Sequence, residues 1–138
     1  MPARDVHHDA VRNALSKDGW TITHDPFVLK WGTRDLFVDL GAERLLAAEK
    51  GTRKIAVEVK GFTGPSEMVE LERALGQYLL YQDVLAERDP DRVLYLAVPA
   101  QVMDELFDEP IGRLLLRNQR VRLVVFGPRE ELIVRWIP

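Results

Sequence analysis

Hydrophobic and polar residues alternate along the segment KIAVEVK at residues 54–60. The period of two predicts a β-strand that carries Ile55, Val57 and Val59 on one face and Glu58 and Lys60 on the other. If that second face is covered, the carboxylate and the ammonium are costly to desolvate and indicate chemistry. If it is solvated, they form an ordinary surface pair. The fold around the strand therefore decides the role of the pair.

The rest of the pattern predicts an α/β fold. Strands are expected before this segment at 20–23, 27–31, 35–40 and 44–50, and after it at 93–98, 121–126 and 131–136. Apolar stripes predict helices over 5–17, 66–88 and 102–118. A turn at 51–53 predicts a hairpin, and the helical connection that follows residue 60 is how two strands come to lie parallel. We expect a mixed central β-sheet flanked by helices, with the strand at 54–60 near its middle.

The strand at 93–98 is nearly all apolar, which is typical of a strand buried on both faces. In such a sheet the face that carries Glu58 and Lys60 is at least partly covered, and we expect it to open toward a pocket edged by the helix that carries Gln77. Leu71, Leu75 and Leu79 are expected to form the core stripe of that helix. The sheet residues expected in the core are Val57, Val59, Leu94, Leu96 and Val98.

Length and composition indicate one soluble domain, residues 1–138. The chain has no cysteine, which excludes disulfides and thiolate metal sites. It has neither an apolar run long enough to span a membrane nor a signal-peptide core, so we expect a cytoplasmic protein without membrane contact. The net charge of −3 does not favour simple binding to DNA phosphates. An acidic cluster that a divalent metal neutralises would reconcile this charge with DNA chemistry.

Glu58 and Lys60 lie about 6.5–7 Å apart along one strand face, so both can reach one bound group. Metal-assisted phosphodiester hydrolysis uses carboxylates to hold Mg²⁺ or Mn²⁺ and a cation near the attacking water. One Glu cannot hold the ion, and the upstream acids Asp35, Asp39 and Glu43 are the candidates for a second ligand. The hairpin register favours Glu43, whereas Asp39 needs a bend in the chain to reach, and both stay open.

The pattern Asp39…Glu58-Val59-Lys60 resembles the PD-(D/E)XK nuclease superfamily, which has the restriction-endonuclease-like fold. The longer stretches ARDVHHDAVRNALSKDGWTITHDP, DLFVDLGAERLLAAEKGTRKIAVEVKGF, ALGQYLLY and RVLYLAVP are similar to the XisH family, the fdxN element excision controlling factors of cyanobacteria. This second resemblance covers nearly the whole chain.

The resemblance implies a restriction-endonuclease-like core and a role in programmed DNA excision together with an XisI-like partner protein. It implies that Asp39 and Glu58 are metal ligands and that Lys60 stabilises charge or orients the water. It also implies that Gln77, in ALGQYLLY, points at the site.

Relatives in the superfamily often add an acid from the first helix, and Asp5 and His8 are the matching positions. The alternative for His8 is a solvated first helical turn. Two hypotheses follow: a Mg²⁺-dependent or Mn²⁺-dependent DNA endonuclease, or a catalytically inactive accessory protein that acts through an XisI-like protein or DNA. Homo-oligomerisation is left open.

Overall fold

The computed structural model describes residues 6–35 and 45–138 of the chain. The elements lie in the following order: α1 His8–Lys17, β1 Thr21–His24, β2 Lys30–Trp31, β3 Arg34–Asp35, β4 Leu45–Lys50, β5 Arg53–Val59, α3 Glu67–Arg88, β6 Arg92–Pro99, α4 Ala100–Val102, a π-helix Met103–Phe107, α5 Pro110–Arg117, β7 Leu123–Gly127 and β8 Leu132–Ile137.

The described residues form a six-stranded mixed sheet with the strand order β1-β4-β5-β6-β7-β8, and β2 pairs separately with β3. β5 pairs with β6 and β6 with β7 in parallel, while β1–β4, β4–β5 and β7–β8 are antiparallel. The α/β class and the near-central place of β5 are therefore confirmed. The sheet is consistent with a restriction-endonuclease-like core.

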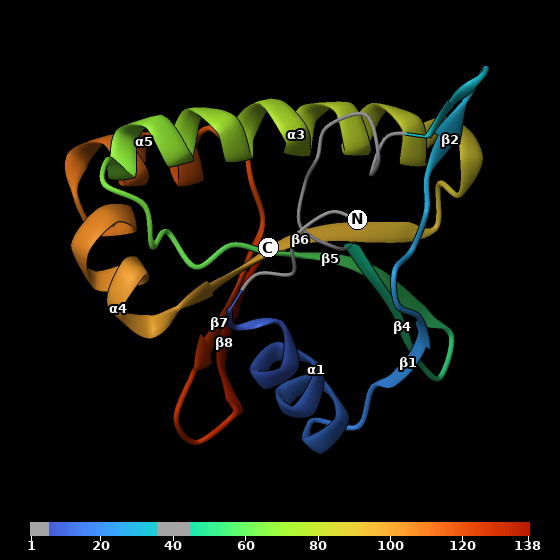
Figure 1. Cartoon of the computed structure of the whole chain (residues 1–138), viewed down its shortest axis with the longest axis horizontal. Coiled ribbons are helices and arrows are strands. Elements are labelled where there is room, and N and C mark those ends of the chain that lie inside the picture. The colour runs from blue at the N-terminus through green and yellow to red at the C-terminus, as the bar shows by residue number, and fades with distance from the viewer. Residues whose placement is uncertain (1–5, 36–44) are drawn as a thin grey trace.

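Helices cover both faces of the sheet, with α3 and α5 on one side and α1 on the other (Figure 1). The core against α3 includes Ala56 and Leu96 from the sheet, and the core against α1 includes Val57 and Val59. All five sheet residues expected in the core are fully buried. The even-numbered positions of β5 thus face α3, and the odd-numbered positions face α1.

Local signals in the sequence set the two connections on either side of β5. Gly51 adopts φ +62° in the β4–β5 turn, a conformation that glycine reaches without steric cost. The resulting register places Glu58 opposite Leu45. At the start of α3 the Ser66 hydroxyl accepts a hydrogen bond from the Val69 N–H at 3.3 Å, which is an N-cap.

The single helix expected over 102–118 is wrong, because the structure divides this segment into α4, the π-helix and α5. Pro110 occupies the first turn of α5, and in a continuous helix its ring would clash with the carbonyl four residues earlier. A Cβ on Gly112 would lie 2.3 Å from the Phe107 Cα, so the close approach of α5 to the end of the π-helix requires glycine at this position.

Two further expectations need correction. Leu79 is 62% exposed and does not belong to a core stripe. The buried residues of α3 are Leu71, Ala74, Tyr78, Tyr81, Val84 and Leu85. The strand expected over 27–31 is limited to β2 at Lys30–Trp31. Of the strand expected over 35–40, residues 36–40 lie outside the described residues, and Asp35 ends β3.

Candidate functional site

Glu58 is fully buried on β5, on the face that packs against α3. Its register partners on the neighbouring strands are the apolar residues Leu45 and Leu96. An ionised carboxylate that is fully buried carries a desolvation cost of several kcal/mol unless a cation or metal ion offsets its charge. The solvated surface pair, one of the two alternatives that the sequence leaves open, is therefore not the arrangement in the structure.

Lys60 follows directly after β5 and is 7% exposed. Its N–H donates a hydrogen bond to the Ala97 carbonyl at 2.9 Å, which continues the parallel pairing with β6 beyond the end of β5. The side chain follows Glu58 by two positions and so lies on the same face of the sheet. Both side chains are enclosed, and the expected opening toward a pocket is not seen at Glu58, which has no exposed surface.

One flank of α3 carries the predicted Gln77 together with Tyr81, one helical turn later. Gln77 is half-buried, and within residues 6–35 and 45–138 its Oε1 is buried without a hydrogen-bond partner. Tyr81 is buried. Two turns before Gln77, Glu70 accepts a hydrogen bond from the Gly64 N–H at 2.8 Å. This contact ties the first turn of the same flank to the loop that leaves Lys60.

The upstream acids are only partly within the structure. Asp39, Glu43 and Asp5 lie outside the described residues, and Asp35 is placed by its backbone pairing with Lys30 in the β2–β3 hairpin. Among the described residues, no three His or carboxylate side chains are grouped closely enough to hold a metal. Of the predicted ligand set, the structure thus locates Glu58. Its buried, oxygen-donating side chain fits a hard divalent cation.

His8 lies elsewhere, and its interpretation as part of a solvated turn is wrong. The side chain is fully buried, and Nε2 lies 3.0 Å from both carboxylate oxygens of Asp25. Because an ionised carboxylate only accepts hydrogen bonds, Nε2 carries a proton and donates a hydrogen bond to Asp25. Arg12 Nη1 also donates to Asp25, at 2.6 Å. The helix that carries His8 covers the face of the sheet opposite to Glu58.

Asp25 is a residue that sequence reasoning missed. Burial alone would raise the pKa of Asp25, but the hydrogen bond and charge of His8, with those of Arg12, outweigh it and hold the pKa below 3.8. His8 and Asp25 are 17 positions apart, and no local pattern links the two residues. Their pairing fastens the start of α1 to the segment after β1.

The protein is an α/β protein with helices on both faces of its sheet, and the sheet is consistent with a restriction-endonuclease-like core. A buried Glu-x-Lys pair lies at the end of a central strand. The chain belongs to the XisH family, because the family model described as XisH protein matches residues 1–134.

Solved structures agree with this assignment. An XisH family protein from Nostoc punctiforme is 38% identical, with a TM-score of 0.87 over 97% of this chain and 100% of that one. A fdxN element excision controlling factor protein from Anabaena variabilis is 39% identical, with a TM-score of 0.88 over 98% of this chain and 100% of that one. A search of curated proteins found no match. No helix in the described residues has the length and hydrophobicity needed to cross a membrane.

Proposed function

We propose that the protein is an XisH-type DNA-excision controlling factor whose sheet carries a metal-dependent endonuclease site of the PD-(D/E)XK kind. The observation that carries the proposal is the complete burial of Glu58 two residues before the buried Lys60, at the end of a central strand. Charged groups are rarely buried in this way without a partner or a metal, and they cluster at functional sites. The description of the Anabaena variabilis relative as an excision controlling factor supports the role in excision.

Each residue has a distinct role in the proposed site. Glu58, together with Asp39 or Glu43, would hold Mg²⁺ or Mn²⁺, both of which prefer oxygen ligands. When bound, the ion would supply charge stabilisation at the phosphate and lower the pKa of a water. The Lys60 ammonium has no lone pair, so it is no ligand and instead stabilises negative charge or orients the attacking water. Gln77 Oε1 can accept a hydrogen bond from that water.

The test is DNA cleavage by purified protein on supercoiled, linear and branched substrates with Mg²⁺ or Mn²⁺. Glu58→Gln and Lys60→Ala should each lower the cleavage rate by about 100-fold or more, the size of effect seen when one charge-stabilising group is lost. Glu72→Gln, an exposed acid on α3, is the matched control and should cleave like the wild type. Wild-type protein that cuts none of the substrates, or a Glu58→Gln variant that cuts normally, would reject the endonuclease.

A second candidate is an accessory protein that cuts nothing and acts through an XisI-like partner. The observation that favours it is β8, which is an edge strand of the sheet and exposes Leu132 and Val134. An apolar edge strand is a surface that a partner can cover by pairing with it.

Co-expression with an XisI-like protein, followed by size-exclusion chromatography, tests this candidate. The two proteins should elute as one complex, which Val134→Lys disrupts. Met68→Lys, which changes an exposed apolar residue on α3, should leave the complex intact. Separate elution of the wild-type proteins at micromolar concentration would count against a partner.

A further inference from the structure

A groove of about 410 Å³ lies between α3 and α5, two helices that cover the same face of the sheet (Figure 1). Both helices contribute to its mainly apolar lining, which consists of Leu75, Tyr78, Leu79, Gln82, Leu115 and Arg120. Arg120 comes from the turn after α5. None of the described residues of the proposed cleavage site lines this groove, so it is a separate surface of the protein.

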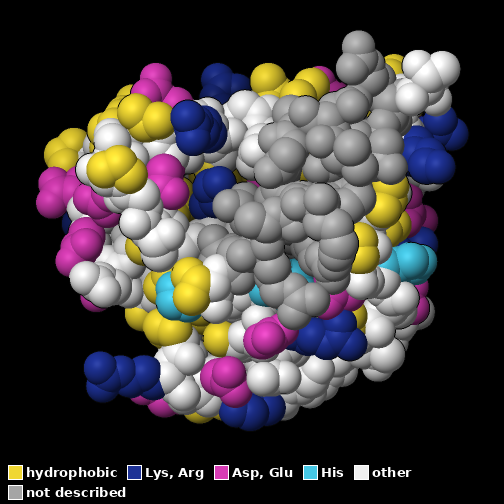
Figure 2. Space-filling model, in the orientation of Figure 1, with side chains coloured by type: hydrophobic (Ala, Val, Ile, Leu, Met, Phe, Trp, Pro, Cys, Tyr) yellow, Lys and Arg dark blue, Asp and Glu magenta, His cyan; other side chains and the backbone are white. Residues whose placement is uncertain are grey.

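Large apolar side chains are exposed on both sides of the groove. Leu79 is 62% exposed on α3, and Ile111 and Leu114 are each 39% exposed on α5. Because Leu115 lies four residues after Ile111 on the same side of α5, that side of the helix borders the groove. In Figure 2, hydrophobic side chains lie between basic and acidic ones along the upper edge of the molecule, which α3 forms in Figure 1. Exposed apolar side chains that gather around an apolar groove mark a surface for binding another protein.

The two sides of the groove carry opposite charges. Asp83 and Glu87, which are exposed, follow Leu79 at intervals of four residues and so lie on its side of α3. All charged side chains of α5 and of the turn after it are arginines, of which Arg117 and Arg120 are exposed. Among the residues that the structure describes, none of these four charged groups forms an ion pair. The groove thus lies between an acidic side, Asp83 and Glu87, and a basic side, Arg117 and Arg120.

Two residues of α3 at the groove have features that the described part of the chain does not explain. The Gln82 Oε1 is buried and accepts no hydrogen bond from residues 6–35 or 45–138, which is unfavourable for a polar atom. Gly76 lies in the middle of α3, three residues before Leu79, where alanine would favour the helix. A Cβ on Gly76 would meet no described atom within 4 Å, so the helix itself does not require glycine there. A protein that covers the groove would explain both, because it can supply a hydrogen-bond donor and approach the helix closely at Gly76.

We propose that this groove is the interface of a two-fold symmetric homodimer. A two-fold axis that runs along the groove places α3 of one copy over α5 of the other, and symmetry forms the reverse pair. Each acidic side then faces the basic side of the other copy, and each Leu79 enters the other groove beside Leu115. Because the surface is complementary to itself in charge and in apolar character, its occupant is a second copy of this chain and not an unrelated protein. The inference goes beyond the proposed function and does not depend on DNA.

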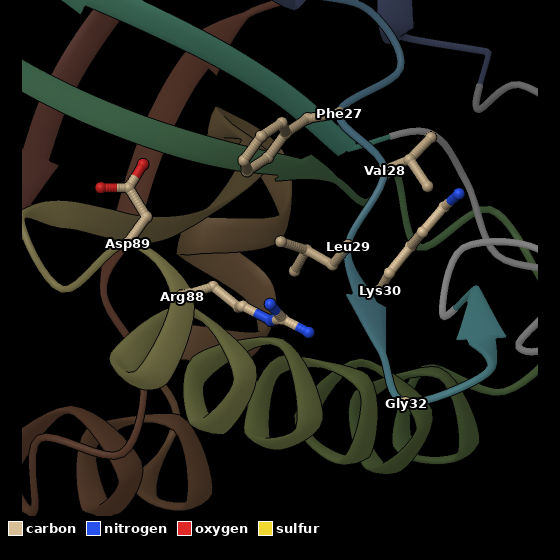
Figure 3. Close-up of a pocket in the computed structure, with 7 residues that line it drawn as sticks. All are labelled: Phe27, Val28, Leu29, Lys30, Gly32, Arg88 and Asp89. Atoms are coloured by element: carbon tan, nitrogen blue, oxygen red, sulfur yellow. The ribbon is translucent and has the colours of Figure 1, made fainter.

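A larger cavity, of about 520 Å³, lies between the segment 27–32 and the C-terminal end of α3 (Figure 3). Its charged side chains do not act on one point, because Lys30 and Arg88 point in different directions in Figure 3. Asp89 is already paired, since it accepts hydrogen bonds from Lys54 at 3.2 Å and from Arg92 at 2.9 Å. Self-complementary charges and apolar side chains are therefore a feature of the groove between α3 and α5 and not of this cavity.

Sedimentation equilibrium from micromolar to submillimolar protein concentration tests the inference. The wild type should pass from monomer to dimer over this range. Leu79→Lys should raise the dissociation constant of the dimer by about 30-fold or more, because it places an unpaired charge at the centre of the apolar contact. Val134→Lys on β8 is the matched control, since Val134 is 57% exposed and Leu79 is 62% exposed, and it should dimerise like the wild type. Circular dichroism checks that both variants keep the fold of the monomer.

Charge reversal tests the two-fold arrangement. Arg120 and Gln82 line the same groove, and Asp83 directly follows Gln82, so Asp83 of one copy is expected to face Arg120 of the other. Asp83→Arg and Arg120→Asp each bring like charges together at two places in a homodimer, so each should raise the dissociation constant by about tenfold or more. In an equimolar mixture of the two variants every reversed position faces an opposite charge. Heterodimers should therefore form with about the affinity of the wild type.

Three results would overturn the inference. A wild type that stays monomeric at submillimolar concentration rejects the homodimer and assigns the groove to a different occupant, such as a helix of another protein. A dimer that Val134→Lys dissociates and Leu79→Lys does not would lie at the β8 edge and not at the groove. A mixture of Asp83→Arg and Arg120→Asp that stays monomeric under conditions in which the wild type dimerises rejects the two-fold arrangement. None of these results bears on the cleavage site, which is tested separately with Glu58→Gln.

Discussion

Replacing Glu58 and Lys60 together by Met should make the metal-free protein more stable. The Glu58 carboxylate is fully buried and Lys60 is 7% exposed, so the protein carries a desolvation cost for two charged groups that methionines of similar volume would not impose. Exchanging a buried charge pair for well-packed apolar side chains is often neutral or stabilising by about 1–4 kcal/mol, whereas removing one charge alone leaves the other buried and uncompensated. For a chain of this length, each kcal/mol raises the melting temperature by about 3 °C.

Urea unfolding of the wild type and the Glu58→Met/Lys60→Met double variant, each in EDTA and in MnCl₂, measures this effect. In EDTA we expect the double variant to unfold at a higher urea concentration with the same dependence on urea. Mn²⁺ at about 100 times its dissociation constant should then stabilise the wild type by about 2.7 kcal/mol and leave the double variant unchanged. Glu58→Gln, which keeps the shape and removes the charge, is the matched control.

The reasoning is refuted if the double variant loses more than about 2 kcal/mol in EDTA. Such a loss would mean that the charge pair contributes net stability to the folded protein. Glu58 and Lys60 would then be structural residues, and their burial would no longer point to a site.

Three further predictions concern stability. The pKa of Asp25 is lowered in the folded state, so the contribution of Asp25 to stability is complete above pH 3.8 and is lost as the pH falls through the folded pKa. Urea midpoints measured between pH 6 and pH 2 should therefore fall less steeply for Asp25→Asn than for the wild type. Asp104→Asn, at an exposed position, is the control. The Tyr78 hydroxyl donates to a β6 carbonyl at 2.9 Å and accepts from the Arg122 N–H at 3.1 Å, so Tyr78→Phe should cost about 1–3 kcal/mol in urea unfolding. Gly112→Ala should lower the melting temperature, because its Cβ would lie 2.3 Å from backbone; a variant as stable as the wild type would contradict the close approach.

The features that the sequence predicts correctly are those with a local physical cause. The alternation in 54–60 depends only on the period of a strand, and the turn at Gly51 fixes the register that sets Glu58 opposite Leu45. The apolar run at 93–98 reflects burial of residues 94–98 on both faces of β6, while Val93 is exposed. These patterns are sufficient to place Glu58 and Lys60 together at the end of a central strand.

The predictions from sequence fail where small rotations add up along a helix and where residues far apart in the sequence come into contact. Residues four apart on a helix are rotated by 40° relative to each other, so the stripe from Leu71 through Leu75 drifts off the core and leaves Leu79 exposed. The buried His8 donates a hydrogen bond to Asp25, which lies 17 positions later, and no periodic pattern in the sequence predicts that contact. The acid that completes the site stays a prediction, since Asp39 and Glu43 lie outside the described residues.

The most direct test of the proposed site is calorimetric titration of Mn²⁺ into the wild type, Glu58→Gln and Lys60→Ala. The account predicts that the wild type binds Mn²⁺ and that Glu58→Gln does not. Lys60→Ala should bind as tightly as the wild type or more tightly, because a competing positive charge is removed from the same strand face. If the wild type and Glu58→Gln bind Mn²⁺ alike, Glu58 is not a metal ligand, and its burial beside Lys60 is a feature of the fold alone.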